Sequence, residues 1–186
     1  GARIVCPSFA DDAAGLLRIA MRSRGFTLYL EPKALYNSVE ASSVVPEEFE
    51  GPFGKARIRR EGTDLSMITY GNTTHFCLNV AERLAQEGWS VEVIDLRSLI
   101  PLDKETIYAS VKKTSKALVV HEDKVFSGFG AEIAAGIGTE LFRYLDAPVQ
   151  RVGSVFTPVG FHPILEKAIL PTEDKIYDAA RTLLEY

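Results

Sequence analysis

Strand-like and helix-like patterns of apolar residues alternate along most of the chain. Short apolar runs rich in β-branched residues predict strands, at residues 64–71, 90–96, 116–122 and 148–153. Stretches with apolar residues every three or four positions predict helices, at residues 74–88, 101–114, 130–145, 163–169 and 172–186. This alternation predicts an α/β fold, with a mostly parallel sheet and helices on both of its faces.

The first 36 residues show the same alternation on a smaller scale. They predict a strand, a helix and a second strand, at residues 2–7, 12–23 and 26–31. Asp11 or Asp12 is expected to cap the helix, and Gly25 to end it. A single βαβ unit is too small to cover both faces of a sheet, so we expect it to be part of a larger domain and the chain to be a fragment.

Residues 37–61 lack a clear period and contain two prolines and two glycines, which predicts a linker or an extended crossing segment. The basic cluster at residues 55–60 is interpreted as a solvated face of this linker, with a patch for a phosphate or an acidic partner as the alternative. The chain therefore divides into three parts, at residues 1–36, 37–61 and 62–186. Asp103 is expected to cap the helix predicted over residues 101–114.

Composition narrows the class of protein. The formal net charge is −4, which does not favour binding to nucleic acid or to an anionic membrane. No apolar run reaches the roughly 20 residues that a transmembrane helix needs. The two cysteines, Cys6 and Cys77, are far apart and do not form a disulfide framework, so we expect a reducing compartment and a cytoplasmic protein.

Candidate chemistry lies at the carboxyl ends of the predicted parallel strands, where α/β sheets bind ligands. His121 and Glu122 end one strand and should point to opposite faces of the sheet. One interpretation makes them a cap and a contact to a neighbouring loop or subunit, and the other makes His121 an acid, a base or a substrate-positioning residue. Asp95 and Arg97 follow another strand and are interpreted mainly as a buried or interface ion pair.

The remaining motifs favour structural roles. Residues 128–130, Gly-Phe-Gly, could expose helix N–H groups to a phosphate, but their distance from the strand favours a tight turn. His75 near a helix start is expected to be neutral and hydrogen-bonded, and His162 to lie in a loop. No spacing of histidines, cysteines or carboxylates predicts a metal site.

Several stretches together resemble the beta subunit of thiamine diphosphate-dependent 2-oxo acid dehydrogenases. These stretches run in the family's order over almost the whole chain: EPKALY, REGTDLSMITYG, VEVIDLRSLIPLDKETIYASVKKT, VVHEDKVFSGFGAEIAA and LDAPVQRVGSVFTPVGFHPILEKAILP. YG before His75 and HE at residues 121–122 are closer to the branched-chain (2-oxoisovalerate) type than to the pyruvate type. The resemblance implies that residues 1–36 end a pyrimidine-binding domain and that residues 62–186 form a transketolase C-terminal domain.

The resemblance also implies thiamine diphosphate and magnesium in the intact enzyme. In the family, a glutamate and a catalytic histidine come from earlier parts of the beta chain, and the diphosphate and magnesium are held by the alpha subunit. We therefore assign no catalytic, cofactor-binding or metal-binding residue here and expect the fragment to bind no cofactor. The family's structural potassium ion is in doubt, because Arg24-Gly25-Phe26 replaces the usual turn.

The resemblance implies three partners: a second beta chain through the C-terminal domain, an alpha subunit or alpha-like region, and the lipoyl acyltransferase core. The intact enzyme would decarboxylate a 2-oxo acid oxidatively and transfer the acyl group to lipoamide. The alternatives are a non-catalytic assembly module and another transketolase-like enzyme, such as acetoin dehydrogenase. Six residues are candidates for an interface or crevice, with the two phenylalanines as packing anchors: His75, Arg97, His121, Glu122, Phe126 and Phe129.

Overall fold

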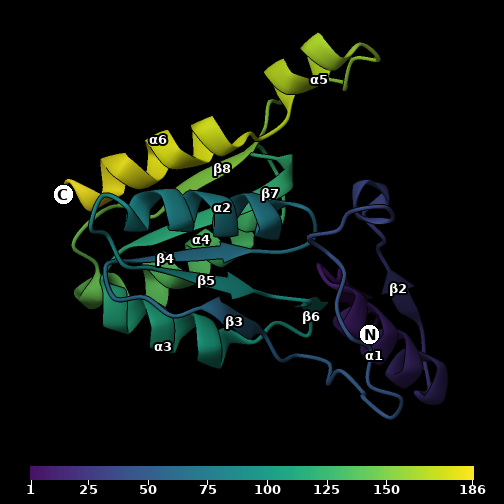
Figure 1. The fold of residues 1–186 in the computed structure, drawn as a ribbon. Coiled ribbons are helices and arrows are strands. Elements are labelled where there is room, and N and C mark those ends of the chain that lie inside the picture. Colours follow the sequence, from purple (N-terminus) through teal and green to yellow (C-terminus); the bar gives the residue numbers. More distant parts are fainter.

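The computed structural model describes residues 1–186 as two sheets of unequal size that meet at a polar junction (Figure 1). The larger sheet has the strand order β3-β5-β4-β7-β8, and all its strands are parallel except β3, which runs antiparallel to β5. Its strands are β3 (Arg57–Arg60), β4 (Leu65–Thr69), β5 (Val91–Asp95), β7 (Ala117–Lys124) and β8 (Gln150–Ser154). The predicted α/β fold with a mostly parallel sheet is confirmed.

Helices cover both faces of this sheet, as Figure 1 shows. One face packs against α2 (Thr73–Ala85) and α6 (Glu173–Leu184), and the other against α3 (Lys104–Thr114) and α4 (Gly130–Glu140). Successive residues of each strand alternate between the two faces. The two sets of side chains therefore form two separate apolar clusters, one on each side of the sheet.

The smaller sheet has the order β2-β1-β6. Strands β1 (Arg3–Val5) and β2 (Thr27–Tyr29) are parallel and are joined by α1 (Ala10–Arg22), which confirms the predicted βαβ unit. Strand β6 (Ser98–Ile100) was not predicted, and it pairs antiparallel with β1. Because β6 follows β5 after two residues, the chain crosses from the larger sheet to the smaller one almost at once.

The end of the predicted linker belongs to the larger sheet. Arg57–Arg60 form β3, so the interpretation of the basic cluster as a solvated linker face is wrong at Arg59, whose side chain is only 9% exposed. The preceding residues cross α1. There, Arg18 donates hydrogen bonds to the carbonyl oxygens of Pro46 and Phe49, at 2.8 and 3.0 Å.

One predicted helix cap is confirmed and one is wrong. Asp103 accepts a hydrogen bond from the backbone N–H of Thr106 at 3.2 Å and caps α3. Helix α1 begins at Ala10 after Phe9, without a side-chain cap, and both aspartates lie inside its first turn. The reason is that the carboxylates of Asp11 and Asp12 pair with arginines of β3 instead of with backbone N–H groups.

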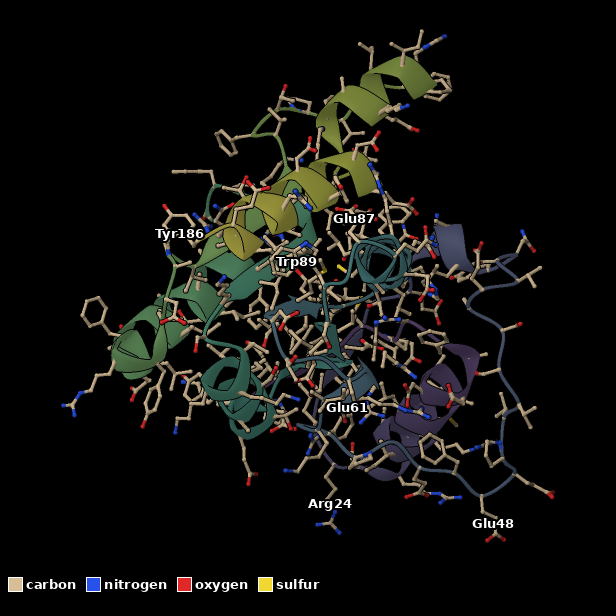
Figure 2. The ribbon with its side chains drawn as sticks, turned by 60° about the vertical axis from the view of Figure 1, so that its left-hand side comes forward. Arg24, Glu48, Glu61, Glu87, Trp89 and Tyr186 are labelled. Carbon is tan, nitrogen blue, oxygen red and sulfur yellow. The ribbon has the colours of Figure 1, made fainter.

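The end of the chain includes a projecting segment. Helix α4 stops at Glu140, earlier than predicted, and the short 3-10 helix η2 (Phe142–Tyr144) follows. After β8, residues 155–170 leave the sheet and form a projecting arm that carries α5 (Pro163–Ile169), seen at the top of Figure 1. Arg24 and Glu48 point outward from the smaller part of the molecule in Figure 2. No helix has the length and apolar character needed to cross a membrane.

Candidate functional site at the junction of the two sheets

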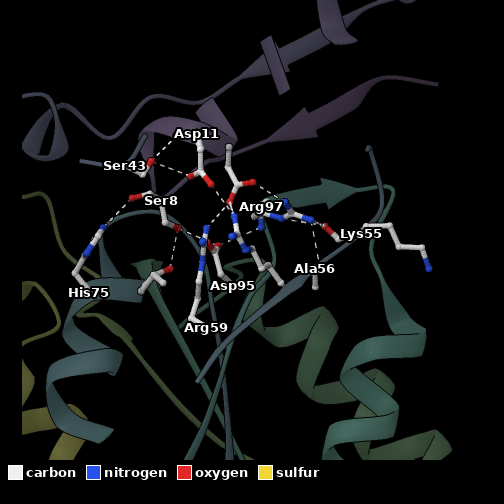
Figure 3. A network of polar contacts seen from close by, with 12 residues as sticks. Ser8, Asp11, Ser43, Lys55, Ala56, Arg59, His75, Asp95 and Arg97 are labelled. Carbon is white, nitrogen blue, oxygen red and sulfur yellow. Dashed lines mark hydrogen bonds and ion pairs between the residues drawn. The ribbon is translucent and has the colours of Figure 1, made fainter. Parts of the chain in front are cut away.

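The junction is organised around Arg97, at the crossing from β5 to β6 (Figure 3). Arg97 has a φ of 56°, in the left-handed region, and is only 6% exposed. Its guanidinium donates to Oδ1 of Asp12 at 2.6 Å and to the carbonyl oxygen of Lys55 at 2.8 and 3.2 Å. One side chain therefore ties the crossing to α1 and to the segment before β3.

Asp12 continues the network toward β3 and β5. Its second carboxylate oxygen accepts a hydrogen bond from Arg59, which also donates to Oδ2 of Asp95 at 2.8 and 3.1 Å. The order Arg97, Asp12, Arg59, Asp95 thus alternates in charge, and all four side chains are at most 9% exposed. The two carboxylates and two guanidiniums have no net charge together, and each charge has an opposite partner. Charged groups can be buried when they are paired in this way.

Asp95 is also linked to α2. Ser8 donates to Oδ1 of Asp95 at 2.9 Å and shares a second hydrogen bond of 2.9 Å with the hydroxyl of Thr74. Complete burial raises the pKa of the Asp95 carboxyl, and Arg59 opposes that rise. Nε2 of His75 lies 2.8 Å from the carbonyl oxygen of Ser8, so this buried histidine is hydrogen-bonded, as predicted.

The predicted ion pair between Asp95 and Arg97 needs correction. Both residues are buried in ion pairs, but Arg97 pairs with Asp12 and Asp95 pairs with Arg59. Between themselves they share only a backbone contact, from the N–H of Arg97 to Oδ1 of Asp95 at 3.3 Å. Sequence reasoning missed Asp12 and Arg59, although the alternating arginines of residues 57–60 are a signal for an edge strand with one charged face.

Arg57 forms the outer edge of the same network. It donates to Oδ2 of Asp11 at 2.8 Å, and its side chain is 44% exposed. Partial burial raises the pKa of Asp11, but hydrogen bonds, first of all from Arg57, outweigh it and hold this pKa below its ordinary value. Asp11 and Asp12 therefore differ sharply in environment although they are neighbours in sequence.

His121 lies outside this junction, on the face of β7 that packs against α4. It has no exposed surface and packs against neighbouring segments, so of the predicted contacts to a neighbouring loop or a subunit the structure shows the one to a loop. Three glycines surround its ring: an added Cβ would lie 2.3 Å from the ring at Gly130 and 3.0 Å from it at Gly128 and Gly153. Neither ring nitrogen has a hydrogen-bond partner, and burial lowers the pKa of His121.

We expect His121 to make the folded chain sensitive to acid. Its pKa is lower when folded than the ordinary value of 6.5, so the unfolded state binds its proton first. The contribution to stability is complete above pH 6.5 and is lost as the pH falls below that value toward the folded pKa. Urea unfolding from pH 7.5 to pH 5.5 should show a smaller loss of stability in His121→Gln than in the unchanged chain. If the free energy of unfolding fell equally with pH in the two proteins, His121 would not be the source of the acid sensitivity.

The other candidates of the segment from His121 to Gly130 are partly or fully exposed. Glu122 points to the opposite face from His121, as predicted, and accepts a hydrogen bond from Asn72 at 3.4 Å. Phe126 is 66% exposed and lies 4.8 Å, centroid to centroid, from Phe156. Phe129 is half-buried and packs edge-on against Tyr70 at 6.3 Å.

Two motifs have the local roles expected of turns. A Cβ at Gly128 would lie 2.1 Å from the carbonyl oxygen of Lys124, which supports the prediction of a tight turn before α4. His162 is the N-cap of α5, and its Nδ1 accepts a hydrogen bond from the backbone N–H of Ile164 at 3.3 Å. Arg3 donates to the carbonyl oxygen of Arg24 at 2.8 Å, an arrangement that disfavours a potassium ion there.

The donor groups do not fit magnesium or a diphosphate. Three carboxylates are fully buried, and each pairs with a cation: Asp12 and Asp95 with arginines, and Glu92 with Lys113. No group of three or more histidine, cysteine or acidic side chains is arranged to hold a metal ion. Burial raises the pKa of Cys6 to about 12, so its thiol is not a nucleophile near neutral pH. The junction is suited to fixing the position of the two sheets, and we derive no chemical step from it.

Comparison with known proteins identifies the family. Residues 54–176 match the model of the transketolase C-terminal domain, so the chain belongs to that family. The chain is 40% identical over 187 residues to 2-oxoisovalerate dehydrogenase subunit beta of Bacillus subtilis and 40% identical over 185 residues to pyruvate dehydrogenase E1 component subunit beta-1, mitochondrial, of Arabidopsis thaliana. These equal identities do not separate the branched-chain type from the pyruvate type.

The chain spans about half the length of the curated relatives that it matches. The alignments cover 100% of this chain and 57% of the Bacillus protein, and 97% of this chain and 50% of the Arabidopsis protein. A solved structure, described as a split gene transketolase in an inactive beta4 tetramer, matches 99% of this chain and 57% of that chain, with a TM-score of 0.77 and 25% identity. The matched fold therefore includes both sheets of the present structure.

Proposed function

We propose that this chain is the C-terminal portion of the beta subunit of a 2-oxo acid dehydrogenase. The parent enzyme would decarboxylate a 2-oxo acid oxidatively and pass the acyl group to lipoamide, with thiamine diphosphate and magnesium as cofactors. The similarity to beta subunits of pyruvate and 2-oxoisovalerate dehydrogenases over the full chain supports this proposal. The buried carboxylates already form ion pairs, so we propose that the residues that hold the cofactor lie outside residues 1–186.

We propose that these residues fix the position of neighbouring parts of the enzyme relative to one another. The observation that carries this is the buried network of Asp12, Arg59, Asp95 and Arg97, which joins the smaller sheet to the larger one. A cofactor held between subunits needs such a rigid junction, because a displacement near 1 Å at the reacting atoms lowers the rate steeply. Residues 1–36 are then the end of a pyrimidine-binding domain, and most of the remainder is the C-terminal domain.

The partners proposed are an alpha subunit, a second beta chain and the acyltransferase core. The two free, buried cysteines fit a cytoplasmic or other reducing location.

The second candidate function is an assembly module without catalysis, and the absence of a suitable donor set for magnesium in this chain favours that description for the isolated fragment.

Calorimetric titration with thiamine diphosphate and Mg²⁺ tests the proposal. The 186-residue chain should give no heat of binding, because it lacks the residues that would hold the cofactor. The chain extended by its upstream segment and mixed with its alpha partner should bind the cofactor and decarboxylate a 2-oxo acid. Decarboxylation by the 186 residues alone with Mg²⁺ would overturn the proposal, and so would an extended complex that binds no thiamine diphosphate.

A further inference from the structure

A pocket opens in the smaller part of the molecule, at the carboxyl ends of β1 and β2. Residues 7–10 follow β1 and residues 31–32 follow β2, and both segments line the pocket. Its volume is about 220 Å³, and its lining includes Phe9, Ala13, Tyr29, Glu31, Leu35 and Tyr36. The carboxyl ends of neighbouring parallel strands are where α/β sheets bind ligands, so the position of the pocket suits a binding site.

The walls of the pocket are mostly apolar and are held in place. The guanidinium of Arg59 lies 4.0 Å from the centroid of the Phe9 ring, and the backbone N–H of Ala10 donates to the carbonyl oxygen of Ala41 at 2.9 Å. An enclosed apolar cavity of about 150 Å³ accepts benzene. This partly open pocket of about 220 Å³ therefore has room for a ring of that size and a short chain.

The hydroxyl groups of the lining have already committed their protons. Ser8 donates to a carboxylate of the junction at 2.9 Å, and Tyr29 donates to the carbonyl oxygen of Ala13 at 2.6 Å. At the rim, Tyr36 donates to Oε2 of Glu31 at 2.5 Å. A hydroxyl has one proton to donate, so the side chains of the pocket offer a ligand acceptors and no donors.

Glu31 is the one charged residue of the lining. It is exposed at the rim, it forms no ion pair, and its Oε1 accepts no hydrogen bond. Burial, and after it the charge of Glu31, raise the pKa of Tyr29, so this carboxylate acts on the wall of the pocket. The pocket thus combines an apolar interior with an unpaired negative charge at its mouth.

We propose that this pocket binds a small protonated primary amine whose apolar body is the size of a benzene ring. An ammonium group has three donors and no acceptor, so it matches Oε1 of Glu31 and the hydroxyl oxygen of Tyr36. The apolar body lies among aromatic side chains, whose ring faces also attract a cation.

The same chemistry excludes the ligands of the proposed parent enzyme. A carboxylate or a phosphate in this pocket would meet acceptors and a negative charge, so neither a 2-oxo acid nor thiamine diphosphate fits. The inference therefore goes beyond the proposed function and does not depend on it. A lysine side chain of a polypeptide has the same ammonium group, but its thin stem would leave part of the pocket unfilled and lose contacts with the walls.

A titration of the 186-residue chain with phenethylamine, followed by amide chemical shifts in NMR, tests this inference. The expected dissociation constant is about 1 mM, which is typical of so small a ligand, with shift changes centred on residues 7–13 and 29–41. The compound 3-phenylpropanoate has the same ring and chain with a carboxylate in place of the ammonium group, and it should not bind. Butylamine, which has the length of a lysine side chain, should bind about tenfold more weakly.

Glu31→Gln should raise the dissociation constant for phenethylamine by about tenfold, because a charge-assisted hydrogen bond becomes a neutral one. Glu48→Gln is the matched control, since Glu48 has the same charge, is exposed and points outward in Figure 2, and it should leave binding unchanged. Both positions are exposed, so neither change should unfold the chain, and circular dichroism checks this.

Four results would overturn the inference: no saturable binding of phenethylamine, equal binding of 3-phenylpropanoate, equal binding of butylamine, or equal effects of Glu31→Gln and Glu48→Gln. The measurement needs no thiamine diphosphate and no 2-oxo acid. A negative result would therefore refute the amine site alone and leave the proposed function standing.

Discussion

Asp12→Asn is expected to lower the free energy of unfolding by about 3–5 kcal/mol. The carboxylate of Asp12 lies between the guanidiniums of Arg59 and Arg97, and it has no exposed surface. An asparagine has the same shape but no charge, so Arg97 would lose its carboxylate partner and Arg59 would keep only that of Asp95. Urea unfolding followed by circular dichroism measures the loss.

Asp11→Asn is the matched control for Asp12→Asn. It removes a charge from the adjacent residue of the same helix turn, but the partner of Asp11 is Arg57, whose side chain is 44% exposed. Ion pairs with one well-solvated partner contribute about 0–1 kcal/mol, so this variant should lose much less stability than Asp12→Asn. If the two variants lost the same small amount of stability, the buried network would not be what holds the two sheets together.

Gly130→Ala is expected to destabilise the chain by about 1–3 kcal/mol, although alanine favours helices more than glycine does. Gly130 is the first residue of α4, and a Cβ there would lie 2.3 Å from the ring of His121. The ring is enclosed by two further glycines and cannot move aside without displacing the turn before α4. Thermal and urea unfolding both measure this effect.

Gly138→Ala in the same helix is the control for Gly130→Ala. A Cβ at Gly138 meets nothing within 4 Å, so this change should raise stability by about 0.5–1 kcal/mol through helix preference alone. In the double variant with His121→Ala, the cost of Gly130→Ala should largely disappear, because the clashing ring is gone. If Gly130→Ala destabilised the His121→Ala protein as much as the unchanged chain, a clash with the His121 ring would not be the cause of the lost stability.

The four parallel strands of the larger sheet could be predicted because their signals are local. Residues 90–96 and 116–122 are apolar runs of strand length, and the helices between them have amphipathic periods, so burial on both faces follows from the sequence. Asp103 was predicted as a cap because the capping hydrogen bond reaches only three residues along the chain. The family resemblance was visible because it extends over nearly the whole chain.

The junction could not be predicted because its partners are far apart in sequence. Asp12 and Arg97 are 85 positions apart, and Asp12 and Arg59 are 47 positions apart. A local interpretation assigned Asp12 to a helix cap and Arg59 to a solvated linker, and each assignment was plausible for its own segment. Both assignments were wrong because the two side chains are buried, and a buried charged group pairs with an opposite charge and not with water or a backbone N–H.

The sequence by itself determined the fold class, the order of the main helices and parallel strands, and the family, because periodicity and capping act over a few residues. Only the tertiary structure decided which segments meet: that His121 is enclosed by glycines from two other segments, that β6 pairs with β1 in the smaller sheet, and that the arm projects from the domain. These features depend on contacts between residues distant in sequence, and the pattern of one segment holds no information on what packs against it.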